Sequence, residues 1–105
     1  MTVYTLGLWQ VKAEDEHAFV SAWRDLASRT KADFPQGSAV LLRDREVPGL
    51  FISAGPWESI EQIERWRASA TFAEGVAQIK PHLESFEPHT LDAVVSIPSG
   101  RPVVG

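Results

Sequence analysis

Four segments of the chain have the apolar pattern of β-strands. Residues 3–11 are β-branched and aromatic, and their alternation places large apolar side chains on both faces, so we expect both faces to be covered. Residues 37–45 and 50–55 are joined by a short polar turn with a Pro-Gly pair, which predicts a β-hairpin. Residues 90–97 contain a further apolar run and predict the last strand.

Two regions between these strands have helical periodicity. Residues 14–32 carry apolar side chains at intervals of three and four, and acidic residues occupy the first turn, where they favour the positive end of the helix dipole. A second helical region begins at Glu58 or Ser59. Thr71, followed three residues later by Glu74, fits a capping box, which predicts that a new helix starts there.

The order of these elements, β-α-β-β-α-β, predicts an α+β fold of the ferredoxin-like type with a four-stranded antiparallel sheet. We expect one domain over residues 1–97 and an irregular tail, rich in Pro and Gly, over residues 98–105. Helices can cover only one face of such a sheet, whereas residues 3–11 are apolar on both faces and residues 93–95 form a continuous apolar run. A second copy of the chain is the expected cover, so the sequence predicts a homodimer.

Composition excludes several classes of protein. The chain has 105 residues, and its net charge of −4 comes without a basic run, so we expect no nucleic-acid partner. The absence of cysteine excludes thiolate catalysis, and the three histidines lack metal-ligand spacing, so we expect no metal site. No segment has the pattern of a membrane span or a signal peptide, which predicts a soluble cytoplasmic protein without a membrane partner.

Several motifs resemble those of the antibiotic biosynthesis monooxygenase family. They are Trp-Gln-Val-Lys at 9–12, Phe-x-x-x-Trp at 19–23, Leu-Arg-Asp at 42–44, Phe-Ile-Ser and a Trp within 51–57, and Glu-x-Trp-Arg-x-Ser at 64–69. The resemblance covers roughly residues 3–97. It implies a dimeric α/β barrel with a pocket between sheet and helices. Members of the family include cofactor-independent oxygenases of polycyclic phenols and anthrones, haem-degrading enzymes, isomerases, signalling proteins and proteins without known activity.

The resemblance also bears on the cofactor. Haem-degrading members use an Asn on the first strand, a Trp in the second helical region and a His about ten residues later. Trp66 matches the Trp, but Gly7 and Val76 occupy the other two positions, so we expect no haem and no other cofactor. Cofactor-free members use the same Trp together with polar groups such as Asn and Tyr. This chain has no Asn, and its only Tyr is Tyr4.

Three residues are candidates for catalysis. Trp66 is suited to position an aromatic substrate by stacking and through its indole N–H, although its helical spacing also fits a core residue. Arg43 is suited to neutralise a phenolate or enolate, and its structural alternative is an ion pair with Asp44 or Glu46. His89 is suited to act as a general base near neutral pH, and its alternative is an exposed histidine at the entry to a strand.

Further aromatic residues are candidates for a substrate pocket: Trp9, Trp57 and Phe72. For Trp9 we favour packing against a partner protomer over lining the pocket, and Trp23 lies in the apolar stripe of its helix, which favours the core. Two functions remain open. One is cofactor-independent oxidation of a small apolar aromatic or quinol-like molecule in a tryptophan-lined pocket. The alternative is a non-catalytic, small-molecule-binding or stress-associated protein with the same dimeric fold.

Overall fold

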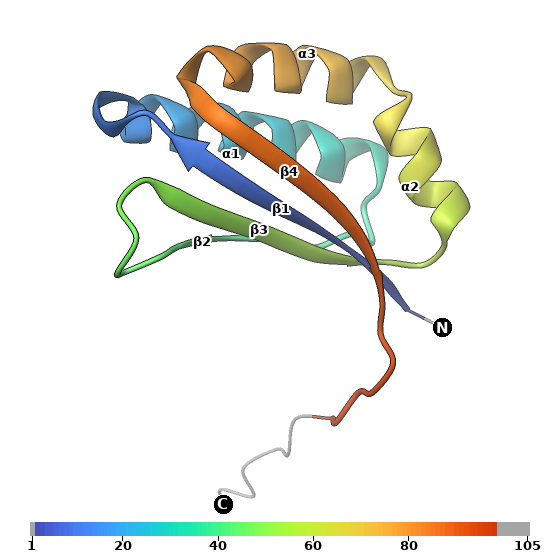
Figure 1. The fold of residues 1–105 in the computed structure, drawn as a ribbon. Coiled ribbons are helices and arrows are strands. Elements are labelled where there is room, and N and C mark those ends of the chain that lie inside the picture. Colours follow the sequence, from blue (N-terminus) through green and yellow to red (C-terminus); the bar gives the residue numbers. More distant parts are fainter. Residues whose placement is uncertain (1, 99–105) are drawn as a thin grey trace, which may run out of the picture.

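A computed structural model describes residues 2–98 of the chain. The strands and α-helices in this part are β1 (Val3–Val11), α1 (Glu16–Asp33), β2 (Val40–Arg43), β3 (Leu50–Trp57), α2 (Ile60–Arg67), α3 (Ala70–Ile79) and β4 (Leu83–Asp92). Short 3-10 turns, Ala13–Asp15 and Lys80–His82, precede α1 and β4. The strands form one antiparallel sheet in the order β2-β3-β1-β4. This arrangement confirms the predicted α+β ferredoxin-like fold (Figure 1).

The three α-helices lie together on one face of the sheet, as Figure 1 shows. On that face Trp9 and Val11 of β1 are buried, and the Trp9 ring stacks on Phe86 of β4 with the ring centroids 4.0 Å apart. Phe19 of α1 is fully buried and packs against Trp9 and against Phe51 of β3. These large side chains form the core that holds the helix layer on the sheet.

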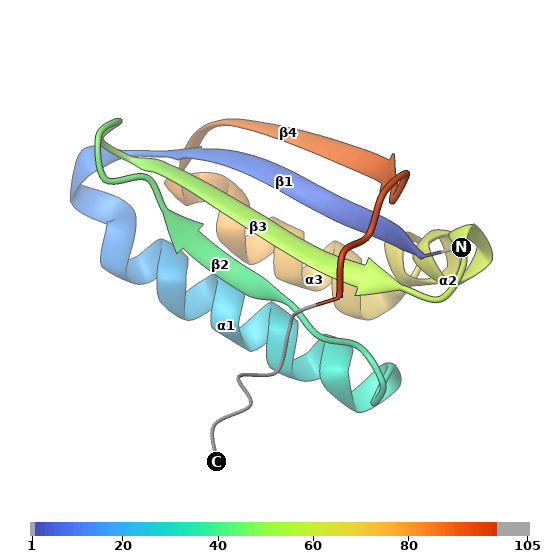
Figure 2. The same ribbon diagram turned by 90° about the horizontal axis from the view of Figure 1, so that it is seen from below.

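No helix among residues 2–98 covers the opposite face of the sheet, which is the face turned to the viewer in Figure 2. Tyr4, Val40, Leu42 and Leu91 are spread over this face, and between 38% and 50% of each is exposed. The apolar alternation predicted for residues 3–11 is therefore present in β1, with one face in the core and one face open.

The start of α3 differs from the prediction. Its N-cap is Ser69, whose Oγ accepts a hydrogen bond from the backbone N–H of Phe72 at 3.2 Å, so the predicted capping box at Thr71 is wrong. The Thr71 hydroxyl instead donates to a carboxylate oxygen of Asp33 at 3.0 Å. Ser59 caps α2 in the same way through the backbone N–H of Gln62. A serine therefore satisfies one N-terminal amide of each of these helices.

The last strand also differs from the prediction. β4 covers Leu83–Asp92 rather than residues 90–97, because its bounds follow those of its neighbour β1. Val3, at the start of β1, lies opposite Asp92, and one further backbone hydrogen bond, from the Ala93 N–H to the Thr2 oxygen at 3.2 Å, follows the end of the strand pairing. The apolar run 93–95 therefore follows the sheet, and Val94 is 87% exposed. Most of the predicted irregular tail, residues 99–105, lies outside the described residues.

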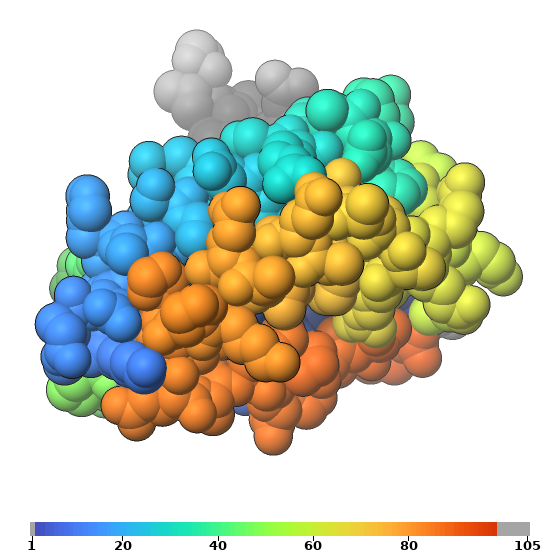
Figure 3. Space-filling model, turned by 90° about the horizontal axis from the view of Figure 1, so that it is seen from above, coloured from blue at the N-terminus to red at the C-terminus, as the bar shows by residue number. Residues whose placement is uncertain are grey.

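A glycine lets two of the helices approach closely. A Cβ atom at Gly75 of α3 would lie 2.5 Å from Cδ1 of Leu26 in α1, so a larger residue there would have to displace the Leu26 side chain. Figure 3 shows α3 beside α1 across the helix side of the molecule. A search of the helices in the described part of the chain finds none with the length and hydropathy needed to span a membrane.

Candidate functional site

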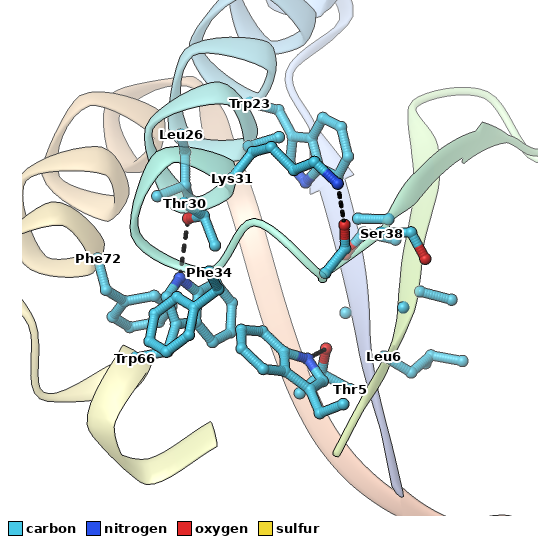
Figure 4. A pocket seen from close by; sticks show the side chains of 18 of the residues that line it. Thr5, Leu6, Trp23, Leu26, Thr30, Lys31, Phe34, Ser38, Trp66 and Phe72 are labelled. Atoms are coloured by element: carbon cyan, nitrogen blue, oxygen red, sulfur yellow. Dashed lines mark hydrogen bonds between the residues drawn. The ribbon is translucent and has the colours of Figure 1, made fainter. Parts of the chain in front are cut away.

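A cavity of about 550 Å³ lies between the sheet and the helix layer. β1 and β3 form its floor, with Thr5 and Trp57 among the lining residues, and the C-terminal half of α1 together with α2 and α3 surrounds the remainder. Figure 4 shows the side chains from these elements converging on this space. A concave site of this size, with a largely apolar lining, has the character of a small-molecule pocket.

Four aromatic rings form one continuous wall of the cavity, which we call the aromatic wall: Phe34, Trp57, Trp66 and Phe72. Neighbouring ring centroids along it are 5.4, 5.0 and 4.7 Å apart. The rings come from the end of α1, the end of β3, α2 and α3, so four separate segments of the chain meet here. Edge-to-face and tilted contacts at these distances fix the ring planes relative to one another.

Hydroxyl groups hold three of the tryptophans in place. The indole N–H groups donate to side-chain oxygens in three pairs: Trp66 to Thr30 at 2.9 Å, Trp57 to Thr5 at 3.0 Å and Trp9 to Ser53 at 2.9 Å. Each hydroxyl accepts from an indole and still has its own proton to donate. Because all three hydroxyl residues line the cavity, they can offer those protons to the oxygen atoms of a ligand.

Trp23 is one of the cavity residues that the sequence did not predict. It packs against the core, as predicted, but it also lines the cavity. Within residues 2–98 its indole N–H has no hydrogen-bond partner in the protein, in contrast to the other three tryptophans. An apolar stripe shows which side of a helix turns inward, but it does not distinguish a packed core from a cavity wall.

The structure brings four of the predicted site residues together. Trp66, Trp57, Phe72 and Trp9 all line the cavity. The indole N–H of Trp66 is already bonded to Thr30, so this residue offers a ligand its ring rather than a hydrogen bond. Trp9 is only 4% exposed and lies on the helix-covered face, so the favoured contact with a partner protomer is wrong.

The other two predicted site residues lie away from this cavity. Arg43 sits near the end of β2, where its Nε is 3.4 Å from a carboxylate oxygen of Glu16 and its guanidinium lies over the ring of Phe51. His89 lies on the open face of the sheet, with Nε2 2.9 Å from a carboxylate oxygen of Glu87. Neither residue is within the lining of the cavity that contains Trp66.

Asp44, one of the ion-pair partners considered for Arg43, has a different role. Its carboxylate accepts hydrogen bonds from the backbone N–H groups of Val47 at 2.8 Å and Glu46 at 2.7 Å. These two bonds hold the pKa of Asp44 below 3.8. Asp44 therefore orders the β2–β3 turn, in which Gly49 has a φ of 77°. The ion pair of Arg43 is formed with Glu16 instead of Asp44.

Within the described part of the chain, the charged side chains that line the cavity are all cations: Arg24, Lys31 and Arg67. Lys31 Nζ donates to the backbone oxygen of Gly37 at 2.7 Å, and Arg67 Nη1 donates to the hydroxyl of Thr90 at 2.9 Å. No Asp, Glu or His side chain of the described chain lines this space. Its polar lining therefore consists mostly of hydrogen-bond donors.

Solved structures with the same fold support the architecture. A Caulobacter crescentus protein named as an antibiotic biosynthesis monooxygenase is 20% identical, with a TM-score of 0.82 over 90% of this chain and 91% of that chain. A mutant of SnoaB, a cofactor-independent oxygenase from Streptomyces nogalater, is 18% identical, with a TM-score of 0.81 over 93% and 98%. Rv0793 from Mycobacterium tuberculosis is 15% identical, with a TM-score of 0.79 over 93% and 100%.

No curated protein sequence matches the chain. At these identities the solved structures establish the fold alone. The family comes from the sequence itself, because residues 2–78 match the profile described as antibiotic biosynthesis monooxygenase. That match covers β1 to α3, the elements that build the aromatic wall and most of the cavity. The chain belongs to the antibiotic biosynthesis monooxygenase family.

Proposed function

We propose that this protein is a cofactor-independent monooxygenase that oxidises a small aromatic or quinol-like molecule in the cavity. The observation that carries this proposal is the aromatic wall, which faces a space of about 550 Å³. A flat aromatic molecule gains contact area and favourable ring geometry against such a surface. The family of the chain, and the oxygenase activity in the name of SnoaB, support the same reaction class.

The substrate supplies the electrons in this reaction. A CH₂ group that is conjugated with a ketone through an aromatic ring, as in an anthrone, loses a proton to water, and the carbanionic carbon of the resulting enolate transfers electrons to O₂ and forms a C–O bond. The hydroperoxide takes up a proton, loses water as the second C–H proton leaves, and becomes a ketone. One oxygen atom of O₂ enters the product and the other leaves as water, so the four electrons that O₂ receives all come from the substrate.

The chain contributes orientation and stabilisation of the enolate. The ring of Trp66, held by Thr30 and by Phe72, positions the substrate ring in the cavity. The hydroxyls of Thr5 and Ser53 point their remaining protons at an oxygen atom on which negative charge develops, because their lone pairs already accept from Trp57 and Trp9. A hydroxyl that accepts a hydrogen bond becomes a stronger donor in turn.

Oxygen uptake with anthrone and with a quinol tests the proposal. We expect consumption that depends on the protein, requires no added metal or cofactor and falls by about tenfold to a hundredfold in Trp66→Phe, the range for a misplaced substrate ring. Thr30→Val keeps the Trp66 ring but removes the bond that orients it, so its rate should lie between the two. No protein-dependent uptake, together with no effect of Trp66→Phe, would reject the proposal.

We further propose that a second copy of the chain covers the open face of the sheet. The face carries Tyr4, Val40, Leu42 and Leu91, each more than a third exposed, which is a large apolar surface for a protein of this size. Two such faces packed against each other form the sheet-on-sheet arrangement that buries both. His89 lies on the same face and would then be close to the partner.

A non-catalytic binding protein is the second candidate function. The observation that favours it is the absence of an Asp, Glu or His side chain from the lining provided by residues 2–98, because such groups usually act as the general base. This candidate predicts that aromatic molecules bind in the cavity while oxygen uptake stays at the rate without protein. Parallel binding and uptake measurements on one anthrone therefore separate the two functions.

A further inference from the structure

We propose that the molecule bound in the cavity is an aromatic acid, with its rings against the aromatic wall and its carboxylate among Arg24, Lys31 and Arg67. This inference rests on the proposed function, because it names the substrate class for the same cavity. It comes from the charges of the lining. The chain as a whole carries a net charge of −4, yet the three charged side chains that residues 2–98 contribute to the lining are all cations.

Within the described part of the chain, these three cations have no carboxylate within 4 Å. Two other arginines differ in this respect, since Arg29 pairs with Glu74 and Arg43 pairs with Glu16, whereas Arg45 and Arg65 lie outside the cavity lining and also have no carboxylate within 4 Å among residues 2–98. A positive charge with no partner in the protein attracts an anionic ligand, and a site lined by one sign of charge raises the local concentration of that ligand.

The cations lie on two sides of the cavity and two of them are already oriented. Arg24 and Lys31 are about two turns apart on α1, so they project from the same side of that helix. Arg67 ends α2, near β4, where Thr90 holds one of its nitrogens. Each group uses at most one of its protons in the hydrogen bonds to Gly37 and Thr90, and further donors remain for a carboxylate.

The rest of the polar lining points to the same class of ligand. Its neutral polar side chains are hydroxyls and indoles, and it contains no Asn, Gln, Asp, Glu or His among residues 2–98. The indole N–H of Trp23 has no hydrogen-bond partner among residues 2–98 and can also donate. Because the site offers mainly donors, the ligand has to supply acceptors, and a carboxylate on an aromatic ring system supplies the strongest.

Two probes with the same ring system test this inference: 9-anthroate, which is an anion at pH 7, and 9-anthracenemethanol, which is neutral. Binding is measured by energy transfer from the tryptophans that line the cavity to the anthracene. We expect 9-anthroate to bind about tenfold or more tightly than 9-anthracenemethanol, as for a hydrogen bond to a charged group. This preference should shrink as salt is added, because salt screens exposed charges.

Charge-removing variants show whether the preference comes from these cations. Arg24→Gln, Lys31→Gln and Arg67→Gln should each weaken the binding of 9-anthroate about threefold to tenfold and leave 9-anthracenemethanol unchanged, which also shows that each variant is folded. Arg65→Gln is the matched control, since Arg65 lies on α2 close to Arg67 but outside the lining, and it should have no effect.

Equal affinity for the two probes would overturn the inference, and so would an equal loss in Arg65→Gln and Arg67→Gln. Binding of neither probe would overturn it as well. These outcomes are distinguishable from a failure of the proposed function, because the binding measurement involves no oxygen. If the protein prefers 9-anthroate but consumes no oxygen, the aromatic acid is supported as the ligand and the proposed monooxygenase activity is rejected. If the protein oxidises anthrone but does not prefer 9-anthroate, the monooxygenase activity is supported and the aromatic acid is rejected as the ligand class.

Discussion

The hydroxyls of Thr5, Thr30 and Ser53 fix the orientation of three of the tryptophan rings that line the cavity. Each accepts a hydrogen bond from an indole that would otherwise be free to rotate or to donate to a ligand. The indole N–H of Trp66, which the sequence suggested as a contact to the substrate, is bonded to Thr30, so in the proposed function Trp66 acts through the position of its ring. At the scale of single residues, the proposal therefore depends on what holds Trp66 as much as on Trp66 itself.

The substitution Thr30→Val measures this support. It removes the acceptor for the indole N–H of Trp66 while keeping the shape of the side chain, so we expect the free energy of unfolding to fall by about 1–2 kcal/mol. Thr71→Val is the matched control, because it removes a more exposed hydrogen bond, to Asp33, from another helix. Urea unfolding of both variants checks the prediction. An equal loss in the two proteins would contradict it.

Asp44 gives a prediction for pH dependence. The backbone N–H groups of Val47 and Glu46 bond its ionised form, so its pKa in the folded protein lies below 3.8. The ionised carboxylate therefore stabilises the folded state above that pH, and this contribution is lost as the pH falls through the folded-state pKa. An NMR titration of the carboxyl carbon should give a midpoint below 3.8, and a midpoint above this value would contradict the prediction.

Arg43 and His89 allow the sequence-based assignment of catalytic residues to be tested. Both lie outside the lining of the cavity, and each contacts a carboxylate of the protein instead. If they take no part in the chemistry, Arg43→Gln and His89→Gln should keep the rate of oxygen uptake within about twofold, the scatter expected of surface changes. A fall in the rate of oxygen uptake comparable to that in Trp66→Phe would show that the substituted residue takes part in the reaction.

At the scale of secondary-structure elements, the N-cap of α3 is Ser69 rather than the predicted Thr71. Ser69→Ala removes the acceptor for the backbone N–H of Phe72 and should lower the free energy of unfolding by about 1 kcal/mol. Thr71→Ala would produce the larger loss if the predicted capping box existed. Because Thr71 lies inside α3, we expect it to cost less than Ser69→Ala, and thermal unfolding of the two variants decides the order.

The sequence predicted the type and order of the elements better than their ends. Periodicities of two and of three to four residues arise from the faces of strands and helices, so residues 3–11 and 14–32 were located closely. The bounds of β4 depend on where β1 begins, which is a property of the pairing and not of the apolar run 93–95. Thr71 has the capping-box pattern with Glu74, whereas Ser69, the actual cap, is followed three residues later by Phe72, so the local pattern favoured the wrong residue.

At the scale of the whole molecule, the sequence predicted the layers and the family but only part of the site. Four of the six predicted site residues line the cavity, since aromatic residues on the inner faces of several elements necessarily meet between sheet and helices. The cationic lining was not predicted. In the sequence, Arg24 and Lys31 have the spacing of ordinary exposed helix positions. Only the tertiary structure shows that they and Arg67 line the same cavity.

The open face of the sheet gives a prediction for the assembly. Sedimentation equilibrium at micromolar concentration should give about twice the monomer mass of 11.6 kDa. Leu42→Glu places a charge on the face and should shift the protein towards monomer. Val47→Glu alters a similarly exposed apolar residue in the β2–β3 turn and should leave the dimer intact. A wild-type protein that sediments as a monomer would contradict the proposed dimer.

Oxygen uptake on anthrone in the presence of 9-anthroate shows whether the aromatic-walled cavity is also the place of reaction. We expect protein-dependent uptake that 9-anthroate inhibits, with an inhibition constant equal to the Kd measured by energy transfer from the tryptophans. Uptake that persists when 9-anthroate saturates the protein would place the chemistry elsewhere. The absence of any protein-dependent uptake would contradict the assignment of an oxygenase.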